Sequence, residues 1–427
     1  MKQFQVQDVQ QNIQEAIEEL WEEEVEFLKE IGRHKSTLGN ENNLQRYIKK
    51  YLQGEMDLLT DSFSVDPKKI SRYENFSPVE WSYSNRPVVV GQWRTDGPKI
   101  GKSLILQGHI DVVSAEPEHL WSYEPYNPIV IDNKLYGRGI ADMKAGVAAM
   151  IFAVKAIQKS GIKLGADLQI QTVIEEECTG NGALALLDRG YVAEGALITE
   201  PTSLTAVKSQ IGVIWMRVNV SGMGAHVERA QSAQNAINKA CYLIEALEKY
   251  KKHINEQEKH DDFKFHDHPL NVNVGTIKGG DWPSNVPSEC SFEVRIGLYP
   301  GTDPSKVQAE VKNWLFEAAK QDSWLRDNLP EVTFFGYHAT GVELNTKNSL
   351  FKTLESAHQS ITKKDLQYTA FTGTTDCRIF EEFGIPSTCY GPAGENIHGI
   401  DEYVNLDTVK TATQTIAAFI LDWCGVR

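Results

Sequence analysis

Acidic and imidazole side chains stand at the ends of three apolar segments in the first half of the chain. His109 and Asp111 end SLILQGHIDVV, Glu175 to Glu177 end DLQIQTVIEEE, and Glu200 ends GALITEP. Residues two apart on a strand point to the same side, so we expect His109 and Asp111 to project together. A histidine oriented by a nearby carboxylate is typical of a metal ligand.

Each of these residues has an ordinary explanation when it is taken alone. A single histidine is more often a packed or surface group than a ligand, and consecutive glutamates often form a solvated strand end. Asp142, in GRGIADMKAG, could simply cap the helix that follows it. Together they are harder to explain without a cation, because clustered carboxylates raise one another's pKa unless a positive charge offsets them. The pattern therefore predicts a site for divalent cations.

The segments around these residues alternate between strand and helix. The three apolar segments above are predicted strands, and MKAGVAAMIFAVKAIQKSG and GALALLDRG are predicted helices. This alternation predicts an α/β fold, with a mainly parallel sheet and helices on both faces. Ligands of such sheets collect beyond the carboxyl ends of the strands, where the acidic and imidazole residues stand.

The pattern changes after Lys208. Strands are predicted at VIWMRVNVSG, LNVNVGTIKGG, CSFEVRIGLYP and EVTFFGY, and one of the two intervening helices begins with Asp303 as its cap and Pro304 at its first position. The order strand, helix, strand, strand, helix, strand is that of a ferredoxin-like α+β sandwich. We predict a catalytic domain at 1–209 and 341–427, and an inserted lid or dimerisation domain at 210–340. The polar, His-rich segment 251–269 is predicted to be a loop extension.

Composition limits the class of protein. A chain of 427 residues is long for one core, so two domains are expected. A net charge of -15 argues against general binding of nucleic acid or anionic membranes. The chain has no apolar stretch of membrane-spanning length, no apolar signal core at its start, and six scattered cysteines without a C-x-x-C pair. These features predict a cytoplasmic protein with free thiols.

As a set, the motifs resemble a known family, the dinuclear zinc amidohydrolases and peptidases. That family includes acetylornithine deacetylase, succinyl-diaminopimelate desuccinylase, aminoacylase and glutamate carboxypeptidase. The resemblance runs from about Leu104 to Val404. The matching stretches are GHIDVV, GRGIADMKAG, EEECTGNGA, ITEPT, SGMGAH, GGDWPSNVP, GTTDCR and GPAGENIHGIDEYV.

The resemblance implies two Zn²⁺ ions per chain, for which Co²⁺ can substitute. Asp142 would bridge the two ions. His109 and Glu200 would complete one metal site, and Glu177 and His398 would complete the other.

The resemblance also implies roles in catalysis. Asp111 would hold the second ring nitrogen of His109, and Glu176 would be the general base. His226, in the inserted domain, would reach the reacting carbonyl, in dimeric members from the neighbouring subunit. A homodimer formed through the inserted domain is therefore expected.

Three further residues, Asn285, Arg295 and Arg378, resemble positions that grip a substrate carboxylate. The planar fork of arginine suits this task because it makes two parallel charge-assisted bonds. A substrate without a carboxylate would instead predict that Arg295 and Arg378 do not face the pocket.

The chain departs from the family pattern in several places. Glu175 stands where an Asp often leads, so the base and the ligand could shift by one residue along the three glutamates. VERAQSAQNA, after His226, lacks the usual proline, and EVR replaces the usual Asp-x-Arg. These departures concern the lid and the pocket more than the metal site.

The resemblance implies hydrolysis of a C–N amide bond in a small N-acylated amine. Our first interpretation is an N-acyl amino acid deacylase similar to acetylornithine deacetylase. Desuccinylation, dipeptide or carboxypeptidase cleavage, and deformylation of an aminomethylpyrimidine in thiamin salvage share the same chemistry. An inactive binding homologue that kept the fold is the alternative from another class.

Overall fold

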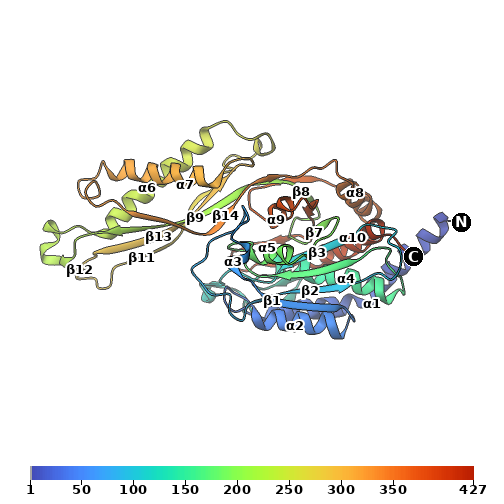
Figure 1. The fold of residues 1–427 in the computed structure, drawn as a ribbon. Coiled ribbons are helices and arrows are strands. Elements are labelled where there is room, and N and C mark those ends of the chain that lie inside the picture. The colour runs from blue at the N-terminus through green and yellow to red at the C-terminus, as the bar shows by residue number, and fades with distance from the viewer. Residues whose placement is uncertain (1) are drawn as a thin grey trace.

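A six-stranded sheet forms the centre of the larger part of the molecule in the computed structural model, which describes residues 2–427 (Figure 1). Its order is β1-β2-β6-β3-β7-β17. The strands are β1 (Leu59–Ser64), β2 (Pro87–Trp93), β3 (Leu104–His109), β6 (Leu168–Val173), β7 (Ala196–Ile198) and β17 (Ser387–Cys389). The four strands from β6 to β17 are parallel, and β1 and β2 are antiparallel to their neighbours. The predicted mainly parallel sheet is confirmed for the strands that carry the candidate ligands.

Helices lie on both sides of this sheet (Figure 1). α1 (Lys2–Arg33), α4 (Ala145–Lys159), α8 (Ser349–Thr362) and α10 (Leu406–Cys424) form one packed group. α3 (Pro67–Ile70), α5 (Asn181–Asp188) and α9 (Cys377–Glu382) form a second group, and α2 (Asn42–Gly54) packs against β1 and β2. The α/β architecture expected from the alternating pattern is therefore present.

Small residues let α4 approach the sheet closely. Almost all of α4 is buried, so it lacks the polar face of a surface helix. A Cβ atom on Gly146, in its first turn, would lie 1.8 Å from the backbone oxygen of Thr199. Only glycine fits there, and the contact packs the start of α4 against the chain that leads to Glu200.

The smaller part of the molecule is a four-stranded antiparallel sheet with two helices. Its order is β11-β13-β9-β14. The strands are β9 (Gly212–Ser221), β11 (Val272–Gly279), β13 (Glu289–Leu298) and β14 (Glu331–Ala339), and the helices are α6 (Ala236–Glu256) and α7 (Pro304–Ala319). The predicted cap of α7 is confirmed, because the Asp303 side chain accepts a hydrogen bond from the Ser305 backbone N–H. This arrangement is ferredoxin-like, and we call residues 210–340 the lid.

Residues 251–269 differ from the expected loop extension. The first six continue α6, and Phe263 is fully buried in a small cluster with Ile211, Leu270 and Ala370. His260 Nε2 lies 2.5 Å from a carboxylate oxygen of Glu343, in β15 (Val342–Glu343). The polar composition of residues 251–269 gave no sign that this segment packs against the rest of the chain, because the packing is made by one aromatic residue, Phe263.

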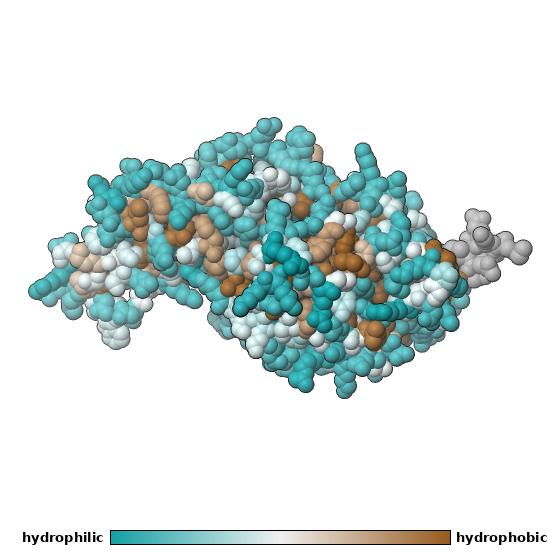
Figure 2. All heavy atoms as spheres, viewed as in Figure 1, coloured by the Kyte–Doolittle hydropathy of each residue, from teal (hydrophilic) through white to brown (hydrophobic). Residues whose placement is uncertain are grey.

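The surface is largely polar on the face shown in Figure 2. Apolar side chains gather there over the lid helices α6 and α7. A search of residues 2–427 finds no helix with the length and apolar character needed to span a membrane. All six cysteines are free thiols.

Candidate active site

His109 ends β3, and Asp111 lies two residues further on. The ring Nδ1 of His109 lies 2.9 Å from the backbone oxygen of Asp111 and 3.7 Å from its carboxylate. That carboxylate accepts backbone N–H bonds from Glu176 and Glu177, at 3.3 and 3.1 Å. Asp111 therefore orients His109 mainly through its backbone carbonyl. Its carboxylate fixes the turn of residues 175–180 that follows β6, which we call the glutamate turn. Asp111 thus contacts the second ring nitrogen of His109 as expected, but the shorter contact is made by its backbone oxygen and not by its carboxylate.

A small second sheet brings two loops together. It has the order β18-β19-β5-β4, with β4 (Ile129–Ile131), β5 (Lys134–Tyr136), β18 (Gly394–Glu395) and β19 (Tyr403–Asn405). Asp142 lies on the loop that follows β5, and His398 lies on the loop between β18 and β19. Because β5 and β19 pair, these two loops lie side by side although they are far apart in sequence.

Glu402 anchors the loop of Asp142. Its buried carboxylate accepts backbone N–H bonds from Gly139, Ala141 and Asp142, at 2.9, 2.9 and 3.1 Å. The guanidinium of Arg138 donates to the same carboxylate at 2.5 Å. Sequence reasoning did not single out Arg138 or Glu402, although both lie in the matching stretches.

The predicted metal ligands converge on the carboxylate of Asp142. Its Oδ1 lies 3.1 Å from His109 Nε2, and its Oδ2 lies 3.4 Å from His398 Nε2. Glu177 lies 3.0 Å from His398 Nε2, and Glu200 lies 3.9 Å from His109 Nε2. The two oxygens of one carboxylate therefore face different histidines, which is the arrangement of a bridging ligand.

Glu176 lies beside the ligand cluster. One carboxylate oxygen is 3.9 Å from His109 Nε2, and the other is buried without a hydrogen-bond partner among the described residues. Burial and the charge of Glu200 hold the pKa of Glu176 well above its ordinary value. The backbone oxygen of Glu176 accepts a hydrogen bond from the Tyr337 hydroxyl, which belongs to lid strand β14.

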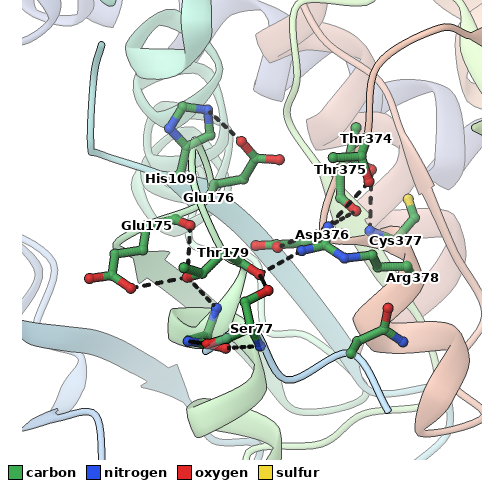
Figure 3. Close-up of polar contacts among 12 residues, drawn as sticks. Ser77, His109, Glu175, Glu176, Thr179, Thr374, Thr375, Asp376, Cys377 and Arg378 are labelled. Carbon is green, nitrogen blue, oxygen red and sulfur yellow. Dashed lines mark hydrogen bonds and ion pairs between the residues drawn. The ribbon is translucent and has the colours of Figure 1, made fainter. Parts of the chain in front are cut away.

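The side chain of Glu175 occupies a different environment and points away from His109 (Figure 3). It is fully buried, and its carboxylate accepts bonds from Trp81 Nε1 and the Tyr83 hydroxyl, both at 2.6 Å. Arg86 Nη1 lies 2.5 Å from the same carboxylate. A shift of the base or ligand role onto Glu175 is therefore excluded by its contacts.

The electrostatics of the cluster fit divalent cations. The charge of Glu177 and a hydrogen bond to Asp142 raise the pKa of His398 to about 11. Burial holds the pKa of Glu200 well above its ordinary value, and Glu200 Oε1 has no hydrogen-bond partner among the described residues. Potential ligand atoms of His109, Glu176 and Glu200 lie within 4.8 Å of one another, as do those of His109, Asp142 and Glu177. Carboxylate and imidazole groups so close together suit bound metal ions, which offset the repulsion.

His226 and Asn285 do not join this cluster in the same chain. They face each other in the antiparallel pair formed by β10 (Ala225–His226) and β12 (Asn285–Val286). Both residues are exposed, and β12 lies at the tip of the lid that is remote from the six-stranded sheet (Figure 1). The structure thus separates these two predicted residues from the metal ligands.

The two arginines predicted to bind substrate differ. Arg378 is fully buried, and its guanidinium donates to the backbone oxygens of Thr375 and Thr179 at 2.7 and 2.9 Å. Its Nε has no hydrogen-bond partner among the described residues, and its expected role in gripping a substrate stays a prediction. Arg295, on β13, is half-buried, and no carboxylate pairs with it among residues 9–427. Burial lowers its pKa.

Comparison with known proteins agrees with this geometry. The sequence pattern of peptidase family M20/M25/M40 matches residues 105–422. The chain is 27% identical over 438 aligned residues to an N-formyl-4-amino-5-aminomethyl-2-methylpyrimidine deformylase of Bacillus subtilis, with 97% of each chain covered. It is 28% identical to an enzyme of the same name from Halalkalibacterium halodurans, with 81% of this chain and 84% of the relative covered.

Solved structures share the fold. A di-peptidase of Saccharomyces cerevisiae has a TM-score of 0.79 at 12% identity, covering 97% of this chain and 98% of its own. Human carnosine dipeptidase 1 has a TM-score of 0.78 at 17% identity, covering 97% of this chain and 99% of its own. The α/β sheet, the lid and the ligand cluster are accordingly those of a metal-dependent hydrolase of amide bonds, and the chain belongs to peptidase family M20/M25/M40.

Proposed function

We propose that this enzyme removes the formyl group from an N-formylated aminomethylpyrimidine. The two curated relatives described above carry this activity in their names, and one of them matches over almost the whole of both chains. This substrate was an alternative in the sequence interpretation, where deacylation of an N-acyl amino acid stood first. The burial of Arg378 supports deformylation over deacylation of an N-acyl amino acid, because a substrate without a carboxylate does not need that arginine in the pocket.

The observation that carries the reaction class is the position of Asp142 between His109 and His398. In the proposal, Asp142 would be shared by two zinc ions, for which cobalt could substitute. His109 and Glu200 would hold one ion, and Glu177 and His398 would hold the other. Two ions bound there would lower the pKa of a water molecule and polarise the substrate carbonyl.

Glu176 is the proposed general base. Its carboxylate accepts the proton of the attacking water as the water oxygen bonds to the carbonyl carbon, and it then gives that proton to the leaving nitrogen as the C–N bond breaks. Asp111 supports this step by fixing the backbone of Glu176 and Glu177. The products are formic acid, which keeps the second proton of the water until it ionises to formate, and a primary amine, so all atoms are accounted for.

The proposal includes a homodimer in which His226 from a second copy reaches the substrate carbonyl as a hydrogen-bond donor. Support comes from the exposure of the lid tip, where Trp282, Val227 and Ile277 are 66%, 50% and 50% exposed. Apolar side chains at such exposure favour contact with another chain. The same lid carries a groove lined in part by Tyr242, Ala246 and Trp314 on α6 and α7. We place the enzyme in the cytoplasm.

A substrate panel tests the proposed function. The protein loaded with zinc or cobalt is assayed with the formylated aminomethylpyrimidine, N-acetylornithine, N-succinyl-diaminopimelate and dipeptides including carnosine. We expect the highest kcat/KM for the formylated pyrimidine. A higher kcat/KM for any of the other substrates would overturn the assignment. Metal binding without turnover of any of them would favour the non-catalytic alternative.

A second candidate is an N-acyl amino acid or a dipeptide, and Arg295 favours it. A half-buried guanidinium without a carboxylate partner is suited to bind the carboxylate of such a substrate. If this candidate is correct, Arg295→Met should raise KM for substrates that carry a carboxylate and leave KM for the formylated pyrimidine unchanged.

A further inference from the structure

Glu175 begins the turn that carries Glu176 and Glu177. It has a positive φ of 65°, in a region that residues other than glycine seldom adopt. Its backbone oxygen accepts N–H bonds from Thr179 and Gly180, at 2.9 and 2.8 Å. The conformation of this one residue therefore sets the direction in which the next two glutamates leave the end of β6.

The side chain of Glu175 is held mainly from outside the turn. Three of its donors, Trp81, Tyr83 and Arg86, belong to the segment 75–86, which precedes β2, and the fourth is the Thr179 hydroxyl within the turn, at 3.0 Å. Arg86 also binds the buried carboxylate of Glu41, with its Nε at 2.9 Å. Glu175 and Glu41 thus share one guanidinium, but only Glu175 belongs to the turn.

The same segment is bonded to the lid. Its Pro78 oxygen accepts from the Gly336 N–H at 2.8 Å, and its Ser77 hydroxyl accepts from the His338 N–H at 3.1 Å. The Ser77 hydroxyl also donates to the Thr179 oxygen at 3.0 Å, a contact visible in Figure 3. The segment 75–86 therefore lies between lid strand β14 and the glutamate turn and bonds to both.

We propose that Glu175 is a positioning residue, through which the segment 75–86 fixes Glu176 and Glu177 at the site. This inference rests on the proposed roles of those two glutamates. The Glu175 carboxylate can accept hydrogen bonds from all of the surrounding donors at once, and its negative charge balances the positive charge of Arg86. An amide at this position would present its own N–H group to those donors, so the turn would lose its anchor although Glu176 and Glu177 remain in the chain.

The experiment compares Glu175→Gln with Glu41→Gln, a matched control. Both changes remove a fully buried carboxylate from Arg86, so both should lower the melting temperature. Only Glu175→Gln should lower kcat, by about 100-fold, with a smaller change in KM, since a displaced base mainly affects the chemical step. Only Glu175→Gln should also change the visible absorption spectrum of the cobalt-loaded protein, because Glu177 would move.

Tyr83→Phe provides a milder variant in case Glu175→Gln does not fold. It removes the hydrogen bond from the Tyr83 hydroxyl to the Glu175 carboxylate, together with the bond that this hydroxyl accepts from Asn181, and should lower kcat by about ten-fold with a smaller spectral change. The proposal is overturned if the variants at Glu175 and Tyr83 match Glu41→Gln in kcat and spectrum. If the wild-type protein hydrolyses no amide, the proposed function fails, and the cobalt spectra still test the positioning role separately.

Discussion

The carboxylate of Asp142 organises the candidate site at the level of single residues. A carboxylate that presents one oxygen to each of two histidines has the arrangement needed to bridge two cations. Its backbone is fixed by Glu402. Burial opposes its charge, but hydrogen bonds from His109 and His398 keep the pKa of Asp142 below its ordinary value. The residue is therefore held as an anion in a defined direction.

The first prediction concerns the different proposed roles of Glu176, the general base, and Glu177, a metal ligand. Glu176→Gln should reduce kcat by about 100- to 10,000-fold, because the proton acceptor is lost, and should leave the bound metal nearly unchanged. Glu177→Gln, its matched neighbour, should lose metal because a ligand is removed. Turnover measurements and elemental analysis of the purified variants check both outcomes. Loss of metal from Glu176→Gln alone would reverse the two assignments.

The second prediction concerns Arg378, whose guanidinium bonds to buried backbone. Arg378→Met should lower the free energy of unfolding by about 2 to 4 kcal/mol, because it removes two buried, charge-assisted hydrogen bonds to backbone oxygens. KM should stay close to the wild-type value. Denaturant unfolding and steady-state kinetics measure the two effects. A raised KM with unchanged stability would restore the substrate-binding role.

The types of residue in the sequence predicted where the candidate metal site lies better than they predicted which way individual side chains point. His109 and Glu200 could be proposed as metal ligands because acidic and imidazole residues have no packing reason to gather at strand ends. His398 and the bridging role of Asp142 follow only from the family resemblance, and the structure brings Asp142 into contact with both histidines. The bonds of Arg378 to buried backbone oxygens could not be predicted, because the sequence does not distinguish a guanidinium bonded to backbone from one that faces a cleft. The anchoring role of Glu402 depends on a loop meeting another loop 260 residues away, which no local pattern records.

At the level of elements, loops held by buried polar contacts position the site. The long strands and helices were predictable because their apolar periodicity is strong. The sheet that pairs β5 with β19 was not, because its strands have only two or three residues. The antiparallel direction of β1 and β2 was also not predicted, since direction depends on how distant strands pair.

The packing of α1 on α10 gives the third prediction. Glu24 in α1 is buried, accepts a hydrogen bond from the Thr413 hydroxyl at 2.6 Å, and leaves its other oxygen without a partner among the described residues. Burial raises the pKa of Glu24 from 4.5 to about 8. A raised carboxyl pKa contributes stability that is present below the unfolded value and is lost as the pH rises through the folded value. The free energy of unfolding should therefore fall by up to about 1.4 kcal/mol per pH unit as the pH rises from 4.5 to about 8.

Glu24→Gln isolates this effect. The amide keeps an oxygen for Thr413 and does not ionise, so the variant should gain stability relative to the wild type as the pH rises. Urea unfolding at several pH values between about 5 and about 8 gives the difference between the two proteins. Parallel stability curves would show that Glu24 is not the source of the pH dependence.

At the level of the whole molecule, the lid separates His226 from the metal ligands. The tip that carries β10 and β12 projects away from the six-stranded sheet (Figure 1). A residue at that tip can complete a site in a second copy far more readily than in its own chain. In the proposed homodimer, the catalytic unit would be the dimer, and each site would contain residues from both subunits.

Mixing two inactive variants tests this arrangement. His226→Ala and Glu176→Gln should each lose activity as homodimers, and each should sediment as a dimer. After subunit exchange at equal amounts, a mixed dimer holds one site with both residues intact, because the Glu176→Gln subunit supplies His226 to its partner. Random exchange predicts recovery of about one quarter of wild-type activity. Recovery requires that His226 acts across the interface, whereas a residue acting within its own chain would leave the mixture as inactive as its components.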